Sequence, residues 1–145
     1  MIDEVPLPST DDPDAAPFWR HALRGELAAQ VCAACHTRRN PPRPMCPACN
    51  SLDSRWEVLS GRGRIWSFVV PHPPLLPAFM PFAPYNVVVV EAEEDPAIRF
   101  VGNLVAAPGA SISSVDPSTI EIGEPVVVAF ELVTDDVALP RFVRA

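Results

Sequence analysis

From residue 56 onward, apolar and polar positions follow the two-residue period of β-strands. Segments 56–59, 64–70, 85–93, 98–106 and 125–133 are rich in Val, Ile, Phe and Trp, and Gly, Pro, Asp and Ser separate them. Closing a small sheet into a barrel removes its exposed edges. We therefore expect a mainly β protein with a five-stranded OB-fold barrel (oligonucleotide/oligosaccharide-binding fold). A small antiparallel sandwich is the alternative.

A short helix is predicted ahead of these strands. Pro17 suits a first helical turn and Gly25 suits a C-terminal cap. Between them, Trp19 and Leu23 lie four positions apart on one apolar face. Residues 27–31 then form a strand. Further along, the turn signal at residues 60–63 predicts a hairpin between segments 56–59 and 64–70, because glycine and serine favour tight turns.

The connection at residues 71–84, here called the proline loop, is both apolar and rich in proline. Because proline has no N–H to donate, we expect neither strand nor helix there. Exposed apolar patches usually mark interfaces. The loop therefore predicts a partner surface, and the alternative is that it folds back over an open end of the barrel.

The four cysteines form two Cys-x-x-Cys pairs, and ten residues separate Cys35 from Cys46. Zinc prefers four tetrahedral ligands and binds thiolates well. Cys32, Cys35, Cys46 and Cys49 therefore predict one structural Zn²⁺ in a small ribbon. Four thiolates leave no open position for catalysis, and an iron site of the rubredoxin type uses the same ligands.

His36 and Asn50 each follow the second cysteine of a pair, a position where the backbone often needs a positive φ. Asn tolerates that conformation, and His does so less readily. Arg38, Arg39 and Arg43 lie close in sequence and are expected to offset the negative sulfur cluster.

Composition narrows the class of partner and the compartment. The chain has 145 residues and a formal charge of −7, and all eleven basic residues are Arg. An acidic protein is a poor partner for phosphate backbones or anionic membranes. No apolar stretch is long enough to span a bilayer, and residues 1–16 lack the pattern of a secretory signal. We expect a cytoplasmic protein, consistent with metal-binding rather than disulfide-bonded cysteines.

The same reading divides the chain into an acidic tail at residues 1–16, a helix with the zinc ribbon at 17–55 and the OB-fold domain at 56–145. It gives no sign of catalysis. The three histidines, His21, His36 and His72, have no nucleophile paired with them in any recognisable motif. Arg62, within the predicted turn at residues 60–63, is a candidate anion contact.

Several motifs together resemble the acyl-coenzyme-A-associated OB-fold family with an N-terminal rubredoxin-like zinc ribbon. The resemblance covers residues 17–145. The residues that carry it are Phe18, Trp19, Gly25, Cys32, Cys35, Pro41, Pro42, Arg43, Pro44, Cys46, Pro47, Cys49, Ser60, Gly61, Arg62, Gly63, Trp66, Ser67, Phe68, Ala83, Pro84, Tyr85, Gly102, Asn103, Leu104, Ile122, Gly123, Pro125, Val126, Leu139, Pro140 and Phe142. His36 and Asn50 depart from it, because the family often has Gly there.

This resemblance implies a non-catalytic accessory subunit of a thiolase-like enzyme, an aldolase or thiolase acting on acyl-CoA thioesters. Some such pairs cleave steroid side chains in bacteria, and a heterotetramer is the implied assembly. The OB domain of these proteins can contribute to the acyl-CoA channel. The residues that we expect to contact acyl-CoA or the partner are His72, Leu75, Leu76, Phe79, Met80, Phe82, Tyr85 and Arg62.

Two other functions fit parts of the pattern. Zinc ribbons and OB-folds also bind nucleic acids, and Trp66 and Phe68 are aromatic residues that can stack on bases. Strand alternation instead predicts that both lie in the core, and the negative charge opposes this function. A rubredoxin-like electron carrier would bind iron and be red.

Overall fold

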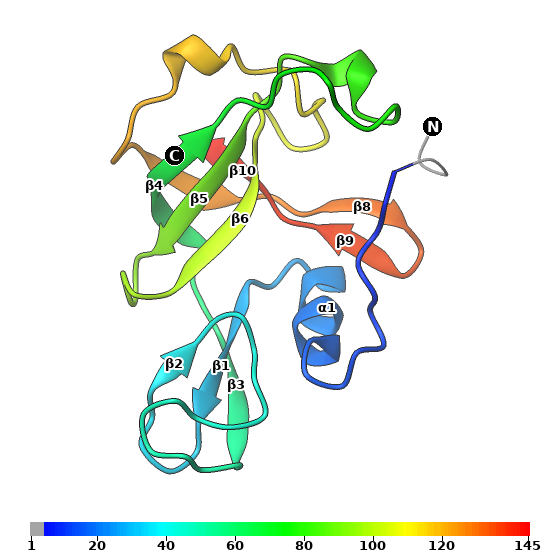
Figure 1. Ribbon diagram of the computed structural model, residues 1–145. Coiled ribbons are helices and arrows are strands. Elements are labelled where there is room, and N and C mark those ends of the chain that lie inside the picture. Colours follow the sequence, from blue (N-terminus) through cyan, green and yellow to red (C-terminus); the bar gives the residue numbers. More distant parts are fainter. Residues whose placement is uncertain (1–4) are drawn as a thin grey trace.

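A computed structural model of the protein describes residues 5–145. The expected acidic tail therefore lies partly, at residues 1–4, outside the described residues. The elements are α1 (Ala16–Leu23), β1 (Ala28–Cys32), β2 (Arg38–Arg39), β3 (Ser54–Val58), β4 (Arg62–Val69), η2 (Met80–Phe82), β5 (Val87–Ala92), β6 (Arg99–Leu104), η3 (Pro117–Thr119), β7 (Pro125–Val128), β8 (Glu131–Thr134), β9 (Val137–Leu139) and β10 (Arg141–Arg144). β2, β1 and β3 form a three-stranded ribbon. Figure 1 shows this ribbon below the barrel, with α1 beside it.

The barrel closes through the strand order β10-β6-β5-β4-β7. β10 runs parallel to β6, and the other pairs are antiparallel. Apart from an irregularity in β4, alternate residues of the barrel strands point inward, and Ile65, Val88, Phe100, Leu104 and Phe142 are almost fully buried. The prediction of a mainly β protein with a five-stranded barrel is confirmed, and the sandwich alternative is excluded.

The predicted hairpin around residues 60–63 is wrong. β3 pairs with β1 of the ribbon along its whole length, and the backbone N–H of Leu59 donates to the carbonyl of Leu27. Residues 59–61 therefore lead from the ribbon into the barrel, and β10 is the fifth barrel strand. A period of two identifies a strand, but it does not identify the neighbouring strand with which it pairs.

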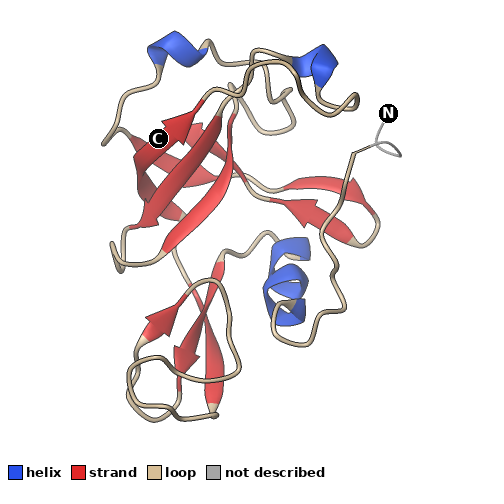
Figure 2. Ribbon diagram, viewed as in Figure 1, coloured by secondary structure: helices blue, strands red, loops and turns tan. Residues whose placement is uncertain are grey.

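The segment at residues 125–133 divides in two. β7 belongs to the barrel, whereas β8 turns away and pairs with β9 in a separate two-stranded hairpin. The expected inward face continues only as far as Phe130, which packs against the core, and Leu132 is 64% exposed. Figure 2 shows this β8–β9 hairpin projecting from the barrel above α1.

α1 covers the space between the ribbon and the barrel. The ring of Phe18 stacks on that of Phe100 with 6.3 Å between centroids, and Ala22 is buried. Leu23, which we expected on the same face as Trp19, is instead exposed. Gly25 follows the helix with a φ of 75°, as expected for its C-terminal cap.

The proline loop combines the two alternatives left open by its sequence. Ala78 is buried and the rings of Phe79 and Tyr85 lie 5.9 Å apart, so this part folds onto the barrel. Leu76 and Met80 of the same loop are exposed. The expectation of no helix is wrong for η2, because a 3₁₀ turn tolerates proline at its start.

A polar cluster joins the ribbon to the barrel. Arg38 of β2 forms an ion pair of 2.9 Å with Glu57 of β3 and lies 3.6 Å from Asp95 in the β5–β6 turn. The side-chain amide of Asn40 donates to the carbonyl of Arg99. Hydrogen bonding to Arg38 lowers the pKa of Glu57, so this carboxylate is ionised at neutral pH.

We predict a small but measurable coupling between Arg38 and Glu57. Both side chains are partly exposed, so a double-mutant cycle with Arg38→Gln and Glu57→Gln should give a coupling free energy of about 0.5–1 kcal/mol. Urea unfolding of the four zinc-loaded proteins at pH 7 measures it. Additive single effects would show that the pair does not stabilise the fold.

Candidate metal centre and apolar groove

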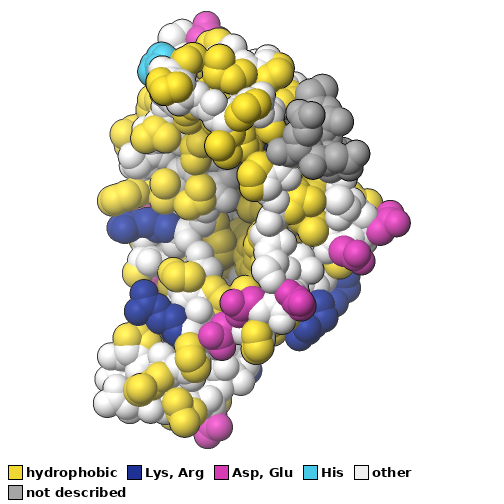
Figure 3. All heavy atoms as spheres, turned by 45° about the vertical axis from the view of Figure 1, so that its right-hand side comes forward, with side chains coloured by type: hydrophobic (Ala, Val, Ile, Leu, Met, Phe, Trp, Pro, Cys, Tyr) yellow, Lys and Arg dark blue, Asp and Glu magenta, His cyan; other side chains and the backbone are white. Residues whose placement is uncertain are grey.

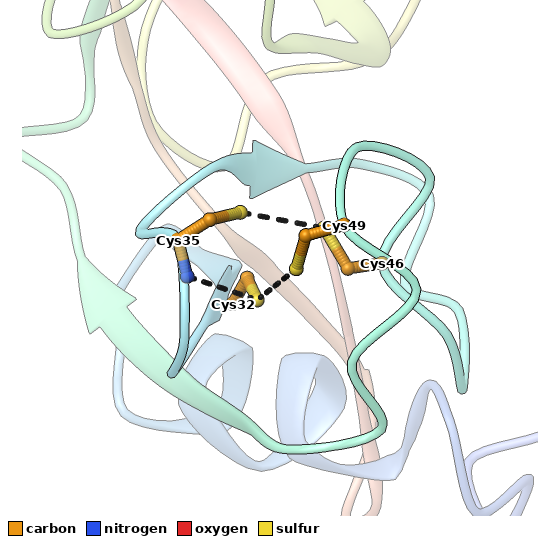
Figure 4. Close-up of side chains that lie close together, drawn as sticks. All are labelled: Cys32, Cys35, Cys46 and Cys49. Atoms are coloured by element: carbon orange, nitrogen blue, oxygen red, sulfur yellow. Dashed lines mark hydrogen bonds between the residues drawn. The ribbon is translucent and has the colours of Figure 1, made fainter.

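The four cysteines converge at the far end of the ribbon from the barrel. Cys32 ends β1, and the other three lie in the loops on either side of β2. Their sulfur atoms all lie within 4.8 Å of one another, and the Cys32–Cys49 and Cys35–Cys46 pairs are each 3.6 Å apart (Figure 4). This arrangement places four soft donors around one point.

The two Cys-x-x-Cys loops have the same local structure. The N–H of His36 donates to the carbonyl of Cys32 at 3.0 Å, and the N–H of Asn50 donates to that of Cys46 at 2.9 Å. His36 and Asn50 both have a φ of 64°. The expected positive φ at these positions is confirmed, so the backbone makes the tight turn even where glycine is missing.

A hydrogen-bond network that the sequence did not predict holds the link between the two pairs. The buried Gln30 side chain accepts from the N–H of Arg43 at 2.7 Å, and its amide donates to Ser54. Arg39 donates through Nε and Nη2 to the carbonyl of Arg43. Arg38 and Arg39 are thus engaged by Glu57 and by the backbone, rather than serving only as free cations near the sulfurs.

The protonation of the four thiols indicates whether a metal ion fits between them. The backbone N–H of Cys35 donates to the Cys32 sulfur at 3.4 Å and lowers the pKa of Cys32 to about 6. At Cys49, a hydrogen bond from the Ser51 N–H lowers the pKa of the thiol. Hydrogen bonding with the neighbouring cysteines outweighs it and raises the pKa of Cys49 to about 12. Four thiolates this close repel one another unless a cation lies between them. The residues therefore fit a divalent metal, which Cys32, Cys35, Cys46 and Cys49 would hold.

A second feature is an apolar groove beside the barrel. It lies between the proline loop, the β8–β9 hairpin and the outer face of β5 and β6. Two adjoining cavities of about 250 and 380 Å³ form it. Both are lined by Val5, Phe79, Ile112, Leu139 and Arg141. Figure 3 shows this hollow with hydrophobic side chains along it.

The residues predicted to contact acyl-CoA or the partner lie in three places: the groove, the exposed proline loop and the start of β4. Phe79, Phe82 and Tyr85 line the groove. His72, Leu76 and Met80 are exposed on the proline loop, and Leu75 is half-buried. Arg62 begins β4, whereas the proline loop follows its other end, and Arg62 pairs with Glu93 at 2.9 Å.

The prediction that Trp66 lies in the core is wrong. A register shift between Ile65 and Ser67 interrupts the alternation of β4, so Phe68 packs toward the core whereas Trp66 is 47% exposed. The guanidinium of Arg99 lies 3.8 Å from the centre of the Trp66 ring. A bulge of this kind is not visible in a hydrophobic pattern.

Several groove residues were also missed by the sequence reading. Val5 and Leu7 belong to a segment read as a tail. Leu139 ends β9 and Arg141 begins β10, two strands that the sequence analysis did not predict. The Val-Pro-Leu-Pro stretch at residues 5–8 was the available signal, because apolar residues are unusual in a solvated tail.

Fold and site together define a zinc-ribbon protein with an OB-fold barrel. Residues 19–54 match the family described as the rubredoxin-like zinc ribbon domain of ChsH2, and residues 56–131 match its C-terminal OB-fold domain. The chain belongs to the ChsH2 family. No helix within residues 5–145 has the length and apolar character needed to cross a membrane.

Relatives include subunits of larger enzymes. The chain is 40% identical over 86% of its length to a probable enoyl-CoA hydratase alpha subunit of Thermomonospora curvata, and spans 36% of that protein. It is 35% identical over 78% of its length to the 3-oxo-4,17-pregnadiene-20-carboxyl-CoA hydratase alpha subunit of Mycobacterium tuberculosis, and spans 32% of it. The chain thus spans about a third of these two proteins.

Two further comparisons cover most of both chains. A DUF35 domain-containing scaffold protein of Methanothermobacter thermautotrophicus is 33% identical over 81% of this chain and 82% of its own length. A solved structure titled Ltp2-ChsH2(DUF35) aldolase matches with a TM-score of 0.80 and 36% identity, over 94% of this chain and 98% of that one. A DUF35 protein of Sulfolobus solfataricus, 9% identical with a TM-score of 0.59, shares the fold alone.

Proposed function

We propose that this chain is a non-catalytic accessory subunit of a thiolase-like enzyme that acts on acyl-CoA thioesters. The observation that carries the proposal is the match, along almost the whole of both chains, to a chain in the Ltp2-ChsH2(DUF35) aldolase structure. Two relatives are also named as alpha subunits of hydratases, and a third is named a scaffold protein. Retro-aldol cleavage of a steroid side-chain thioester is one reaction in this class.

In this proposal, one Zn²⁺ bound by the four cysteines has a structural role. A metal held by four thiolates stiffens the ribbon, and it has no open position at which to activate a substrate. The three regions predicted from the sequence, at residues 1–16, 17–55 and 56–145, then serve as tail, metal-stabilised ribbon and OB-fold partner-binding domain.

The partner surface in this proposal is the exposed side of the proline loop. Leu76 is 58% exposed and Met80 is 44% exposed. In a complex, the apolar surface of both side chains would be buried against the partner. The proposed assembly is a heterotetramer with two copies of each chain, and the acyl-CoA lies at or near their interface. His72 and Leu75, on the same loop, complete the proposed contact surface.

Reconstitution tests the function. This chain and a thiolase-like enzyme from the same organism are purified separately and mixed, and cleavage of acyl-CoA thioesters is followed by product analysis. We expect activity or enzyme stability to depend on this chain. An enzyme that is equally active and stable without it would contradict the proposal.

We predict that the variant Leu76→Asp/Met80→Asp loses complex formation. Two buried, unpaired carboxylates in an apolar interface should weaken binding by about a hundredfold or more, because each carries a desolvation cost of several kcal/mol. Titration by biolayer interferometry measures the effect. Leu52→Asp/Ile122→Asp is the matched control, since Leu52 and Ile122 are 71% and 65% exposed away from this loop. Equal binding by both variants would move the interface elsewhere.

A further inference from the structure

The apolar groove occupies the position where OB-folds usually bind their ligands, over two central strands and between two loops. Its floor includes Val87 of β5 and Val101 of β6. The charged groups among its described lining residues are Arg141 and Glu131, which form an ion pair of 2.9 Å. A groove with this neutral lining favours an apolar occupant over a phosphate chain.

The chain's own N-terminal strap, residues 5–8, covers this groove. Val5 lines both cavities, Leu7 lines one, and Pro6 and Pro8 line the other. Figure 1 shows the strap, in dark blue, running from the start of α1 past the β8–β9 hairpin. Within residues 5–145 no hydrogen bond involves the strap. Within the described residues, the strap thus meets the groove through apolar contacts, and Leu7 remains 37% exposed.

We propose that the N-terminal strap is a displaceable cover, and that an extended apolar segment of the thiolase-like partner replaces it in the complex. The strap itself indicates the chemistry of this occupant. It is apolar, it contains two prolines that cannot donate to a sheet, and it leaves hollow space beneath it. A better-fitting segment of the same character has more apolar surface to bury there.

The position of the groove supports this occupant. Phe79 lines the groove, and its neighbour Met80 belongs to the exposed surface proposed for the partner. A partner bound to the proline loop at Met80 would therefore lie next to the groove. This inference rests on the proposed function, because it names a second contact of the same partner.

Three variants of the full chain separate the possibilities. Leu7→Asp adds a charge to the strap and should release it from the apolar floor. Val101→Asp, at a position 58% exposed, should make the groove itself unfavourable for apolar groups. Ile122→Asp is the control for an added surface charge. Each is measured with the dye 1-anilinonaphthalene-8-sulfonate, which reports open apolar surface, and by titration with the thiolase-like enzyme.

We expect Leu7→Asp to raise dye fluorescence several-fold and to tighten binding to the enzyme. The gain should be about tenfold if the strap covers the groove in roughly nine molecules of ten. Val101→Asp should weaken binding to the enzyme, and in combination with Leu7→Asp it should abolish the gain in dye fluorescence. Ile122→Asp should match the wild type in both measurements.

Other outcomes overturn the inference. Unchanged dye fluorescence in Leu7→Asp would show that the strap is no cover, and unchanged or weaker enzyme binding would show that it does not compete. Dimers of Leu7→Asp in light scattering would make a second copy the occupant. If the wild type and all variants fail to bind the enzyme, the proposed function fails, and the dye result alone decides whether the strap is a displaceable cover.

Discussion

Replacing Cys32 with Ser is expected to remove the metal and unfold the ribbon. The serine hydroxyl is a poor ligand for Zn²⁺, and binding at structural zinc sites supplies about 10–16 kcal/mol that is largely folding free energy. Metal content by mass spectrometry should fall from one zinc per chain toward zero. The near-ultraviolet circular dichroism of the ribbon aromatic Trp56 should be lost, and a chelator should have the same effect on the wild type.

The barrel should survive this change with lower stability. Leu27 and Ala29 of the ribbon segment pack in the same core cluster as Ile65 and Phe142 of the barrel, so unfolding the ribbon opens one side of that core. A thermal unfolding transition of the barrel should remain, at a lower midpoint than in the wild type. Ala34→Ser is the control, because it places the same hydroxyl between Cys32 and Cys35 without removing a ligand. Full zinc content in Cys32→Ser would contradict the assignment of this ligand.

Replacing Asn86 with Ala is expected to reduce the free energy of unfolding by about 3 kcal/mol, because two buried backbone groups lose their partner. Asn86 has no exposed surface, and its amide donates to the carbonyl of Leu104 and accepts from the N–H of the same residue. The side chain thus extends the pairing of β5 with β6. Asn103 in turn donates to the Asn86 carbonyl and accepts from Arg141 at the groove.

Urea unfolding of the zinc-loaded protein measures this loss. Asn86→Asp should be at least as damaging at neutral pH, because it removes the donor and buries a charge. The control is Asn40→Ala, which removes one hydrogen bond at a partly exposed position and should cost less than about 1 kcal/mol. A loss below that value for Asn86→Ala would show that water replaces the side chain.

Sequence reasoning was most successful where the chemistry is local. The spacing of Cys32, Cys35, Cys46 and Cys49 predicts a metal site because two-residue spacing in a tight turn presents both sulfurs to one side, and the structure brings all four together. The positive φ of His36 and Asn50 follows from the same turn. Zinc as the bound ion remains a prediction, and so do the boundaries of the three regions.

Non-local pairing was the source of the errors. β3 has the pattern of a barrel strand, but it pairs with β1, a choice set by contacts between distant segments. Trp66 alternates outward from the buried Ile65, and the bulge that follows in β4 turns Phe68 inward, so the two aromatic residues do not share a face. The change of direction after β7 placed β8 in another sheet. The groove depends on these features and on the N-terminal strap, so its lining could not be read from periodicity.

The central claim is that this chain assembles with a thiolase-like enzyme. Co-expression of the two proteins followed by size-exclusion chromatography with light scattering tests it most directly. We predict co-elution at a single mass equal to two copies of each chain, with one zinc per copy of this one. Separate elution of both folded proteins, with the zinc present, would contradict the account.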